Sequence, residues 1–197
     1  MENFEDLAWL FHCNNRNRGT IRCNLDESAL LWKTVKRTAG PILEIGRCRG
    51  GSTILISVAA DKRKVYSVDL EPVKDPKIND YLIDNNVSVI IDDSRKPINE
   101  SFGMIFFDGD HTYEGIVSDI KAHWKNLKDF GNGPPQALFH DAVRNDGLKY
   151  DNLLNHCPEV KLACRRLIES GAATKIEKAG SMLTVEKIAE LPPDFGE

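Results

Sequence analysis

The sequence has little that suits a membrane protein, a secreted protein or a protein that binds the nucleic-acid backbone. No apolar run approaches the length needed to cross a bilayer. Residues 1–6 are acidic and lack the apolar core of a signal peptide. The formal net charge is -4 with both signs interspersed, which gives no electrostatic reason to expect nucleic acid as a partner. We therefore expect a cytoplasmic protein that binds neither nucleic acid nor a membrane.

Cysteine pairs of the kind that bind zinc are also absent. The five cysteines are an odd number and none has C-x-x-C spacing, so they are best explained as reduced thiols, some of them filling space in the core. The remaining composition, 41% hydrophobic and 28% charged over 197 residues, is typical of one globular domain with a sizeable core.

We expect a single domain made of a helical appendage (1–40), a core (41–187) and a tail (188–197), of which residues 191–197 should be poorly ordered. Apolar residues at helical spacing predict a short helix from Phe4 to Phe11 and a second from Asp26 to Arg37. The second helix should be capped by Asp26 and bury Ala29, Leu30 and Val35. The appendage either packs across the sheet edge or forms a lid or a dimer contact.

Short apolar runs alternate with helical patterns through the core. Since helices cover both faces of such a sheet, its strands read as continuous apolar runs. The pattern predicts a Rossmann-like, doubly wound and mainly parallel α/β sheet that ends in an antiparallel hairpin at 174–177 and 182–186. The predicted parallel strands are Pro41–Ile45, Val65–Leu70, Val87–Ile91, Met104–Phe107 and Ala137–Phe139.

Every one of these five strands ends in a glycine loop or in acidic side chains. In doubly wound sheets, ligands bind outside the carboxyl ends of the strands, and buried acids would cost stability without partners. We therefore expect a ligand site at this rim. The strand-end segments are Glu44-Ile45-Gly46, Asp69, Asp92-Asp93-Ser94, Asp108-Gly109-Asp110-His111 and His140-Asp141.

The first of these loops indicates an adenosine cofactor. Gly46 and Gly50-Gly51 precede a helix that opens at Ser52-Thr53, so backbone amides can approach a ligand closely. Asp69 is placed to accept hydrogen bonds from ribose hydroxyls. A nicotinamide fingerprint needs glycine where this chain has Cys48, which weakens a dehydrogenase interpretation.

Two segments resemble a known family. The stretch EIGRCRGGST at 44–53 resembles motif I of the class I S-adenosylmethionine-dependent methyltransferases, in the form common among small-molecule O-methyltransferases. FFDGDHTYEGIVSDIKAHW and ALFHDA resemble a bacterial methyltransferase family with D-G-D-H and H-D-A motifs. The resemblance implies a seven-stranded sheet whose last strand is antiparallel. It also implies a cofactor site made of Glu44, Gly46, Gly50, Ser52, Asp69, Asp93, Ser94 and Asp108.

Within that implied site, the loop at Gly46 would hold the methionine part, Asp69 the ribose, and Asp93-Ser94 the adenine edge. Arg47 and Arg49 are not part of the motif. They either point to solvent or add positive charge near an acidic substrate.

The ends of the fourth and fifth strands are the predicted reaction centre. A divalent cation lowers the pKa of an acceptor hydroxyl while a base removes its proton. The resemblance implies Asp108, His140 and Asp141 as ligands of Mg2+ or Mn2+, with Asp110 or His111 as the base. Alternatively, Asp108 holds the cofactor while His140 and Asp141 bind loop backbone.

The predicted function is methyl transfer to a small-molecule acceptor, at a hydroxyl oxygen. Nitrogen methylation, a cofactor-binding module without activity, and a nicotinamide oxidoreductase are the alternatives. Base methylation is disfavoured because the N/D-P-P-Y/F segment is absent. The acceptor would meet the polar segments Asn14–Asn24 and Arg144–Asn152, and a homo-oligomer is possible.

Overall fold

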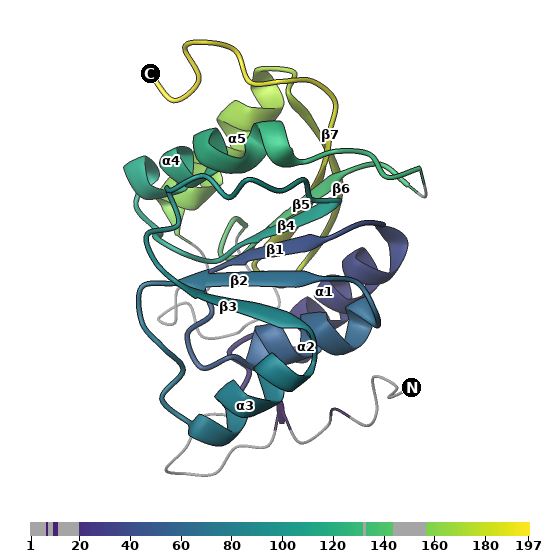
Figure 1. Cartoon of the computed structure of the whole chain (residues 1–197). Helices are drawn as coiled ribbons and strands as arrows, with labels where there is room; N and C mark the ends of the chain where they lie inside the picture. The colour runs from purple at the N-terminus through teal and green to yellow at the C-terminus, as the bar shows by residue number, and fades with distance from the viewer. Residues whose placement is uncertain (1–6, 8–9, 12–19, 132, 144–156) are drawn as a thin grey trace.

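The computed structural model describes residues 7, 10–11, 20–131, 133–143 and 157–197. Its centre is a seven-stranded sheet in the order β3-β2-β1-β4-β5-β7-β6 (Figure 1). The first five strands pair in parallel, and β7 runs antiparallel to both β5 and β6. The predicted fold class is confirmed. The strands are β1 (Ile42–Ile45), β2 (Val65–Asp69), β3 (Val87–Ile91), β4 (Met104–Phe107), β5 (Gln136–Phe139), β6 (Ala173–Ala179) and β7 (Met182–Lys187).

Helices cover both faces of the sheet (Figure 1). One face carries α1 (Leu25–Arg37), α2 (Gly51–Ala60) and α3 (Pro76–Asp84). The other carries α4 (Tyr113–His123), continued by the 3₁₀ turn η2 (Trp124–Asn126), and α5 (Pro158–Glu169). Along β4, Met104 and Phe106 pack into the first layer, and Ile105 and Phe107 into the second. This double burial explains why the strands are apolar without alternation.

The helix α1 differs in detail from its prediction. Its N-cap is Asn24, whose side chain accepts a hydrogen bond from the Glu27 amide while the Glu27 carboxylate accepts one from the Asn24 amide. This reciprocal pair satisfies two amides that a cap at Asp26 would leave open. Leu30 and Val35 are buried as predicted, but Ala29 is exposed. The helix lies beside α2 on the sheet face, so this part of residues 1–40 helps to cover the core.

Two other segments depart from the predictions. The helix α3 was not predicted because Leu82 is its one fully buried residue; Asp75 caps it and Pro76 occupies its first position. The tail was predicted to be poorly ordered, which is wrong. Phe195 is 4% exposed within the core against α4 and α5, and the Arg166 guanidinium donates to the carbonyl of Glu197.

Parts of the N-terminal predictions lie outside the described residues. Phe4, Ala8 and residues 12–19 are among these. The predicted acceptor segment Arg144–Asn152 also lies outside the described residues, because all of it falls within 144–156. Leu7 and Leu10 are described and buried. Among the described residues, every helix is too short or too polar to cross a bilayer.

The buried position of Phe195 yields a test of the tail. Phe195→Ala should lower the free energy of unfolding by about 3 kcal/mol, because it empties a closed core position. Ile188→Ala is the matched control, since Ile188 is 58% exposed, and it should change stability by less than about 0.5 kcal/mol. Urea denaturation measures both values, and equal effects of the two substitutions would contradict the packing described.

Candidate functional site

The order of the strands reverses between β1 and β4, and a pocket of about 440 Å³ opens where they end. Ligands of doubly wound sheets bind at such a switch point. The pocket is bounded by the loops after β1, β2, β3 and β4 and by one face of α4. Its lining includes six aspartates and one arginine, namely Asp69, Asp92, Asp93, Asp108, Asp110, Asp119 and Arg95.

Gly46 lets the β1 and β4 loops touch. Its φ is +90°, and a Cβ there would lie 2.0 Å from the carbonyl oxygen of Asp108. No other residue type fits this contact. Gly50, at φ +83°, caps α2, and a Cβ there would lie 2.9 Å from Ile78. Gly46 lines the pocket as predicted, whereas Gly50 lies behind it.

Glu44 holds the loop from below and does not line the pocket. The side chain is fully buried and accepts hydrogen bonds of 2.6 Å from the hydroxyls of Ser52, Thr53 and Ser67. Burial raises the pKa of Glu44, and these hydroxyls oppose the rise. Glu44 and Ser52 therefore shape the loop and do not line the pocket, and their contact with a cofactor stays a prediction.

Arg47 also stabilises the loop. It neither points to solvent nor faces a substrate, so both predictions for it were wrong. The side chain is 1% exposed, and its Nη1 donates to the carbonyl of Ser67 at 2.6 Å while Nη2 donates to that of Glu71 at 3.1 Å. Burial lowers the pKa of Arg47, and Glu44 and Asp69 counteract the fall. Its charge thus ties the end of β2 to the loop. Arg49 is exposed.

Asp69 both lines the pocket and orders the loop. One oxygen, Oδ2, accepts hydrogen bonds of 2.8 Å from the amides of Arg47 and Cys48, and Oδ1 accepts one of 3.1 Å from Glu71. Cys48 has a φ of +49°, a strained conformation for a residue with a side chain. The two hydrogen bonds to Asp69 stabilise that strained turn.

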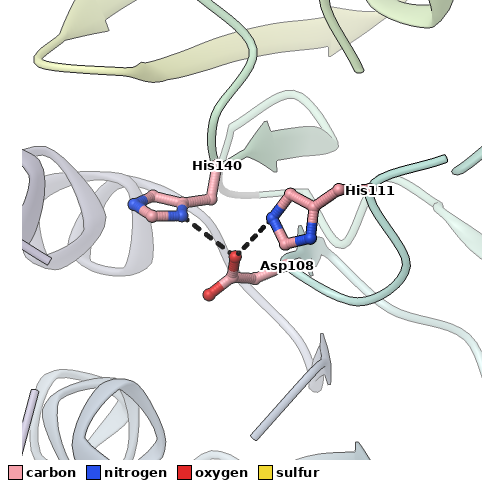
Figure 2. Close-up of side chains that lie close together, drawn as sticks. All are labelled: Asp108, His111 and His140. Carbon is pink, nitrogen blue, oxygen red and sulfur yellow. Dashed lines mark hydrogen bonds and ion pairs between the residues drawn. The ribbon is translucent and has the colours of Figure 1, made fainter. Parts of the chain in front are cut away.

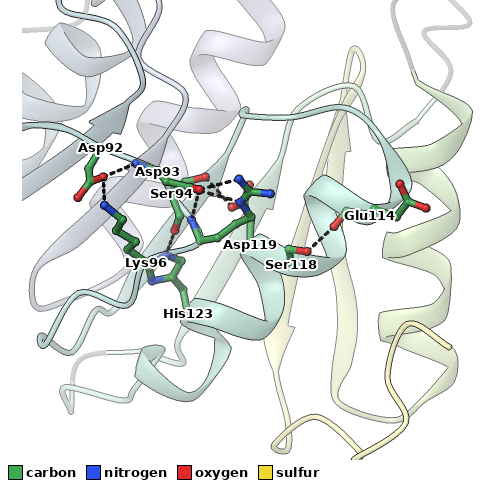
Figure 3. Close-up of polar contacts among 9 residues, drawn as sticks. Asp92, Asp93, Ser94, Lys96, Glu114, Ser118, Asp119 and His123 are labelled. Carbon is green, nitrogen blue, oxygen red and sulfur yellow. Dashed lines mark hydrogen bonds and ion pairs between the residues drawn. The ribbon is translucent and has the colours of Figure 1, made fainter.

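The end of the pocket beside β3 is formed by Ser94 together with two side chains of α4 (Figure 3). The Ser94 hydroxyl donates to Oδ1 of Asp119 at 2.7 Å, and its carbonyl lies 2.6 Å from Nε2 of His123. The predicted Asp93 lines the same end, but Arg95 binds both of its carboxylate oxygens, at 2.6 and 2.8 Å.

Asp119 and His123 were not among the predicted site residues. The ring of His123 is fully buried because it reaches across to Ser94. Gly115, Asp119 and His123 recur every four residues and so share one face of α4. That spacing of a glycine, an acid and a histidine was the available signal. Burial raises the pKa of Asp119 to about 6, and the Ser94 hydroxyl opposes the rise.

Asp108 also belongs to a second group of side chains, which we call the acid–histidine cluster. It consists of Asp108, His111, His140 and Asp141. Nδ1 of His140 lies 3.0 Å from Oδ1 of Asp108, and Nε2 of His111 lies 3.6 Å from the same oxygen, so the two rings flank one carboxylate (Figure 2). Oδ2 of Asp141 lies 3.3 Å from His111 and 3.5 Å from His140. The three predicted ligands therefore meet, and His111 joins them.

The cluster has a supporting residue that was not predicted. Glu27 of α1 lies 3.6 Å from Nε2 of His140 and accepts hydrogen bonds from the amide and hydroxyl of Ser181, at 2.7 and 2.8 Å. Burial alone would raise its pKa, but hydrogen bonds with His140, Ser181 and Asn24 lower it to about 2. Glu27 is therefore a fixed negative charge behind His140.

The carboxylates hold protons on both imidazoles. Hydrogen bonds to Asp108 and Asp141 raise the pKa of His111 to about 9. His140 is more buried, which by itself lowers the pKa, yet Asp108 and Glu27 shift it well above its usual value. Asp141 has a φ of +53°, and such strain concentrates at functional sites.

Asp110 and His111 were alternative bases, and they lie in different places. Asp110 accepts a hydrogen bond of 2.9 Å from the Thr112 amide at the start of α4 and lines the pocket. A Cβ on Gly115 would lie 2.3 Å from the Asp110 carboxyl group. Of the two candidates, only His111 belongs to the acid–histidine cluster.

The cluster fits a divalent cation by its donor set. Atoms of Asp108, His111 and His140 lie within 4.8 Å of one another, and so do those of His111, Asp141 and Cys157. Imidazole with carboxylate suits Mn2+ and similar ions, and carboxylate alone also suits Mg2+. A dication that displaces the two imidazole protons leaves the local charge unchanged. Replacing the two protons by one dication therefore requires no additional acidic side chain in the cluster.

Comparisons with known proteins agree with this architecture. Residues 43–133 match the model of a methyltransferase domain family. A Podospora anserina methyltransferase with bound S-adenosylhomocysteine is similar in structure (TM-score 0.65, 16% identity, 86% of this chain and 80% of that one). So is a SAM-dependent O-methyltransferase of Thermotoga maritima (0.60, 13%, 89% and 69%). No protein of curated function matches by sequence.

An N-methyltransferase shares the architecture as well. The 1,6-didemethyltoxoflavin-N1-methyltransferase of Burkholderia thailandensis has a TM-score of 0.58 and 16% identity, over 82% of this chain and 76% of that one. The fold therefore includes both oxygen and nitrogen methyltransferases, and does not by itself distinguish the acceptor atom.

The raised pKa of His111 predicts a pH-dependent contribution to stability. A pKa of about 9 in the folded chain against 6.5 in the unfolded one makes protonated His111 stabilising below pH 6.5. That contribution is lost as the pH rises through about 9. In metal-free protein, His111→Asn should cost roughly 1 kcal/mol at pH 6, discounted because over a third of the ring is exposed, and almost nothing at pH 10. Urea denaturation across this range measures the difference, and a constant difference would contradict the assignment.

Proposed function

We propose that this chain is a class I methyltransferase that transfers the methyl group of S-adenosylmethionine to a hydroxyl oxygen of a small-molecule acceptor, with help from a divalent cation. One observation carries the proposal. Asp108 lines the cofactor-sized pocket and also belongs to the acid–histidine cluster. A methyl donor in the pocket and an acceptor on the cluster would therefore meet at this residue.

The charge of the pocket supports a cationic ligand. Six aspartates and one arginine line it, and such a field attracts the positive sulfonium of S-adenosylmethionine. The same field repels a dinucleotide, whose two phosphates are negative. A nicotinamide cofactor is therefore disfavoured on electrostatic grounds in addition to the presence of Cys48.

The residues divide the chemistry between them. Asp108, His140 and Asp141 are the ligands we assign to the cation, which when bound would lower the pKa of the acceptor hydroxyl. His111 is the base we assign: a bound cation would displace the proton that the carboxylates otherwise hold on its ring, and its side chain is 38% exposed whereas that of His140 is only 13% exposed. The loop at Gly46 and Asp69 would align the donor for in-line displacement. Asp110 is the alternative base, on the pocket side of the same loop.

Nitrogen methylation and a module without activity are the competing proposals. A neutral amine acceptor needs no bound cation, so a transferase that works equally well in chelator would favour nitrogen. A module without activity gives no reason for two imidazoles and two carboxylates to converge beside the pocket. Cytoplasmic location, a small-molecule acceptor and a homo-oligomer stay predictions.

The cofactor assignment can be tested by calorimetric titration. The chain should bind S-adenosylmethionine and S-adenosylhomocysteine, and should not bind NAD. Asp69→Ala should weaken S-adenosylmethionine binding at least tenfold, because it removes hydrogen bonds to a charged group from both the loop and the ribose. Asp75→Ala, which alters an exposed helix cap outside the pocket, is the control and should bind normally. Binding of NAD alone would overturn the proposal.

The metal assignment can be tested without the acceptor. Metal-free protein should bind one Mn2+ per chain, and Asp141→Ala should weaken this binding at least tenfold. Asp129→Ala is the matched control, because Asp129 is exposed and accepts its hydrogen bond from the nearby Gly131 amide. Calorimetry or the electron paramagnetic resonance signal of free Mn2+ gives the affinity. Unchanged affinity of Asp141→Ala would exclude the ligand set.

A further inference from the structure

Asp119 is a buried acid in the wall of the pocket with an incomplete set of partners. The residue is 1% exposed and lines the pocket. Among the described residues, one hydrogen-bond donor reaches it, the hydroxyl of Ser94 on Oδ1 (Figure 3). A carboxylate accepts about four hydrogen bonds, and a buried one with a single neutral partner is costly. A donor from a ligand would supply what the protein leaves out.

The second oxygen, Oδ2, lies beside the loop after β4, which lines the pocket. A Cβ built on Gly109 would lie 3.3 Å from this oxygen and 2.9 Å from Cγ2 of Ile45, so Oδ2 lies beside Gly109 and Ile45, which line the pocket together with Asp119. Gly109 follows β4 and Ser94 follows β3, which places Asp119 between the two loops at the base of the pocket. Burial also raises its pKa to about 6.

The surroundings hold Asp119 in one position. His123, one helical turn further along α4, lies against the Ser94 carbonyl at 2.6 Å, while Asp119 accepts from the Ser94 hydroxyl. Two side chains of α4 thus bind the hydroxyl and the carbonyl of Ser94. Gly115, one turn earlier on the same face, lines the pocket without a side chain. A fixed acid beside an open helix face is suited to recognising a flat, polar ring edge.

We infer that Asp119 selects the base of the cofactor, with Oδ2 accepting a hydrogen bond from the 6-amino group of adenine. The inference rests on the proposed function and adds to it the residue that distinguishes adenine from a 6-oxo purine. Asp93, the acid predicted for this edge, has both oxygens bound by Arg95 and a side chain 31% exposed. Asp119 has the free oxygen and the burial that make discrimination strong.

The test compares two ligands that differ at one position of the base. S-Adenosylhomocysteine presents an amino donor to Asp119, whereas S-inosylhomocysteine presents an oxygen that a carboxylate repels. Calorimetry on the wild-type chain should show the inosyl ligand binding at least 100-fold more weakly. Asp119→Asn, whose amide can donate to that oxygen, should reduce this ratio to within tenfold.

Asp92→Asn is the matched control. Asp92 lines the same pocket, but Lys96 and the Asp93 amide already bind its Oδ1. Its substitution should leave the ratio of the two affinities within about twofold of the wild-type value. Ser94→Ala, which removes the hydroxyl that holds Asp119, should lower the ratio severalfold and serves where Asp119→Asn does not fold.

The outcomes separate the inference from the proposed function. A wild-type chain that binds both ligands within threefold overturns the role of Asp119 and leaves the cofactor assignment standing. So does an unchanged ratio in folded Asp119→Asn. A wild-type chain that binds neither S-adenosylmethionine nor S-adenosylhomocysteine overturns the proposed function itself.

Discussion

The contact between Gly46 and the backbone of Asp108 is the constraint on which the whole site depends. A side chain at Gly46 would overlap the Asp108 carbonyl, so the ends of β1 and β4 can lie together only with glycine there. This contact closes one side of the pocket. It also sets the position of Asp108, which reaches the acid–histidine cluster from the same loop. The pocket and the acid–histidine cluster therefore share one backbone junction.

Buried acids around this junction are stabilised in three different ways, and the differences correspond to different roles. Glu44 has three hydroxyl donors and supports the loop. Glu27 has two donors from Ser181, the amide of Asn24 and a nearby histidine, and supports the cluster. Asp119 has one hydroxyl and faces the pocket. The protein itself supplies the hydrogen-bond donors of Glu44 and Glu27, whereas it leaves those of Asp119 incomplete. Low local dielectric makes an incomplete carboxylate expensive, which is the reason to assign a ligand to it.

Local pattern predicted the strands well because each is a short apolar run buried on both faces. The boundaries of β3 and β4 were predicted to the residue, and those of β1, β2 and β5 to within one residue at an end. The pattern failed where an element buries few residues or packs against segments far away in the sequence. The helix α3 buries Leu82 alone, and Phe195 is held by contacts with α4 and α5 that nothing in the tail sequence records. Arg47 was misjudged because arginines are mostly exposed, and here three strand-end carbonyls receive its donors.

The sequence by itself determined the class of fold, the glycine loop and the set of acids and histidines at the strand ends, because periodicity and turn chemistry are local properties. Tertiary structure alone decided which of these side chains line the pocket. Glu44 and Ser52 stand in the motif but lie beneath the loop, while Asp119 and Glu27 stand outside every motif and reach the site from α4 and α1. The physical reason is that a side chain's role depends on the donors, charges and space around it, and these come from segments far apart in the chain.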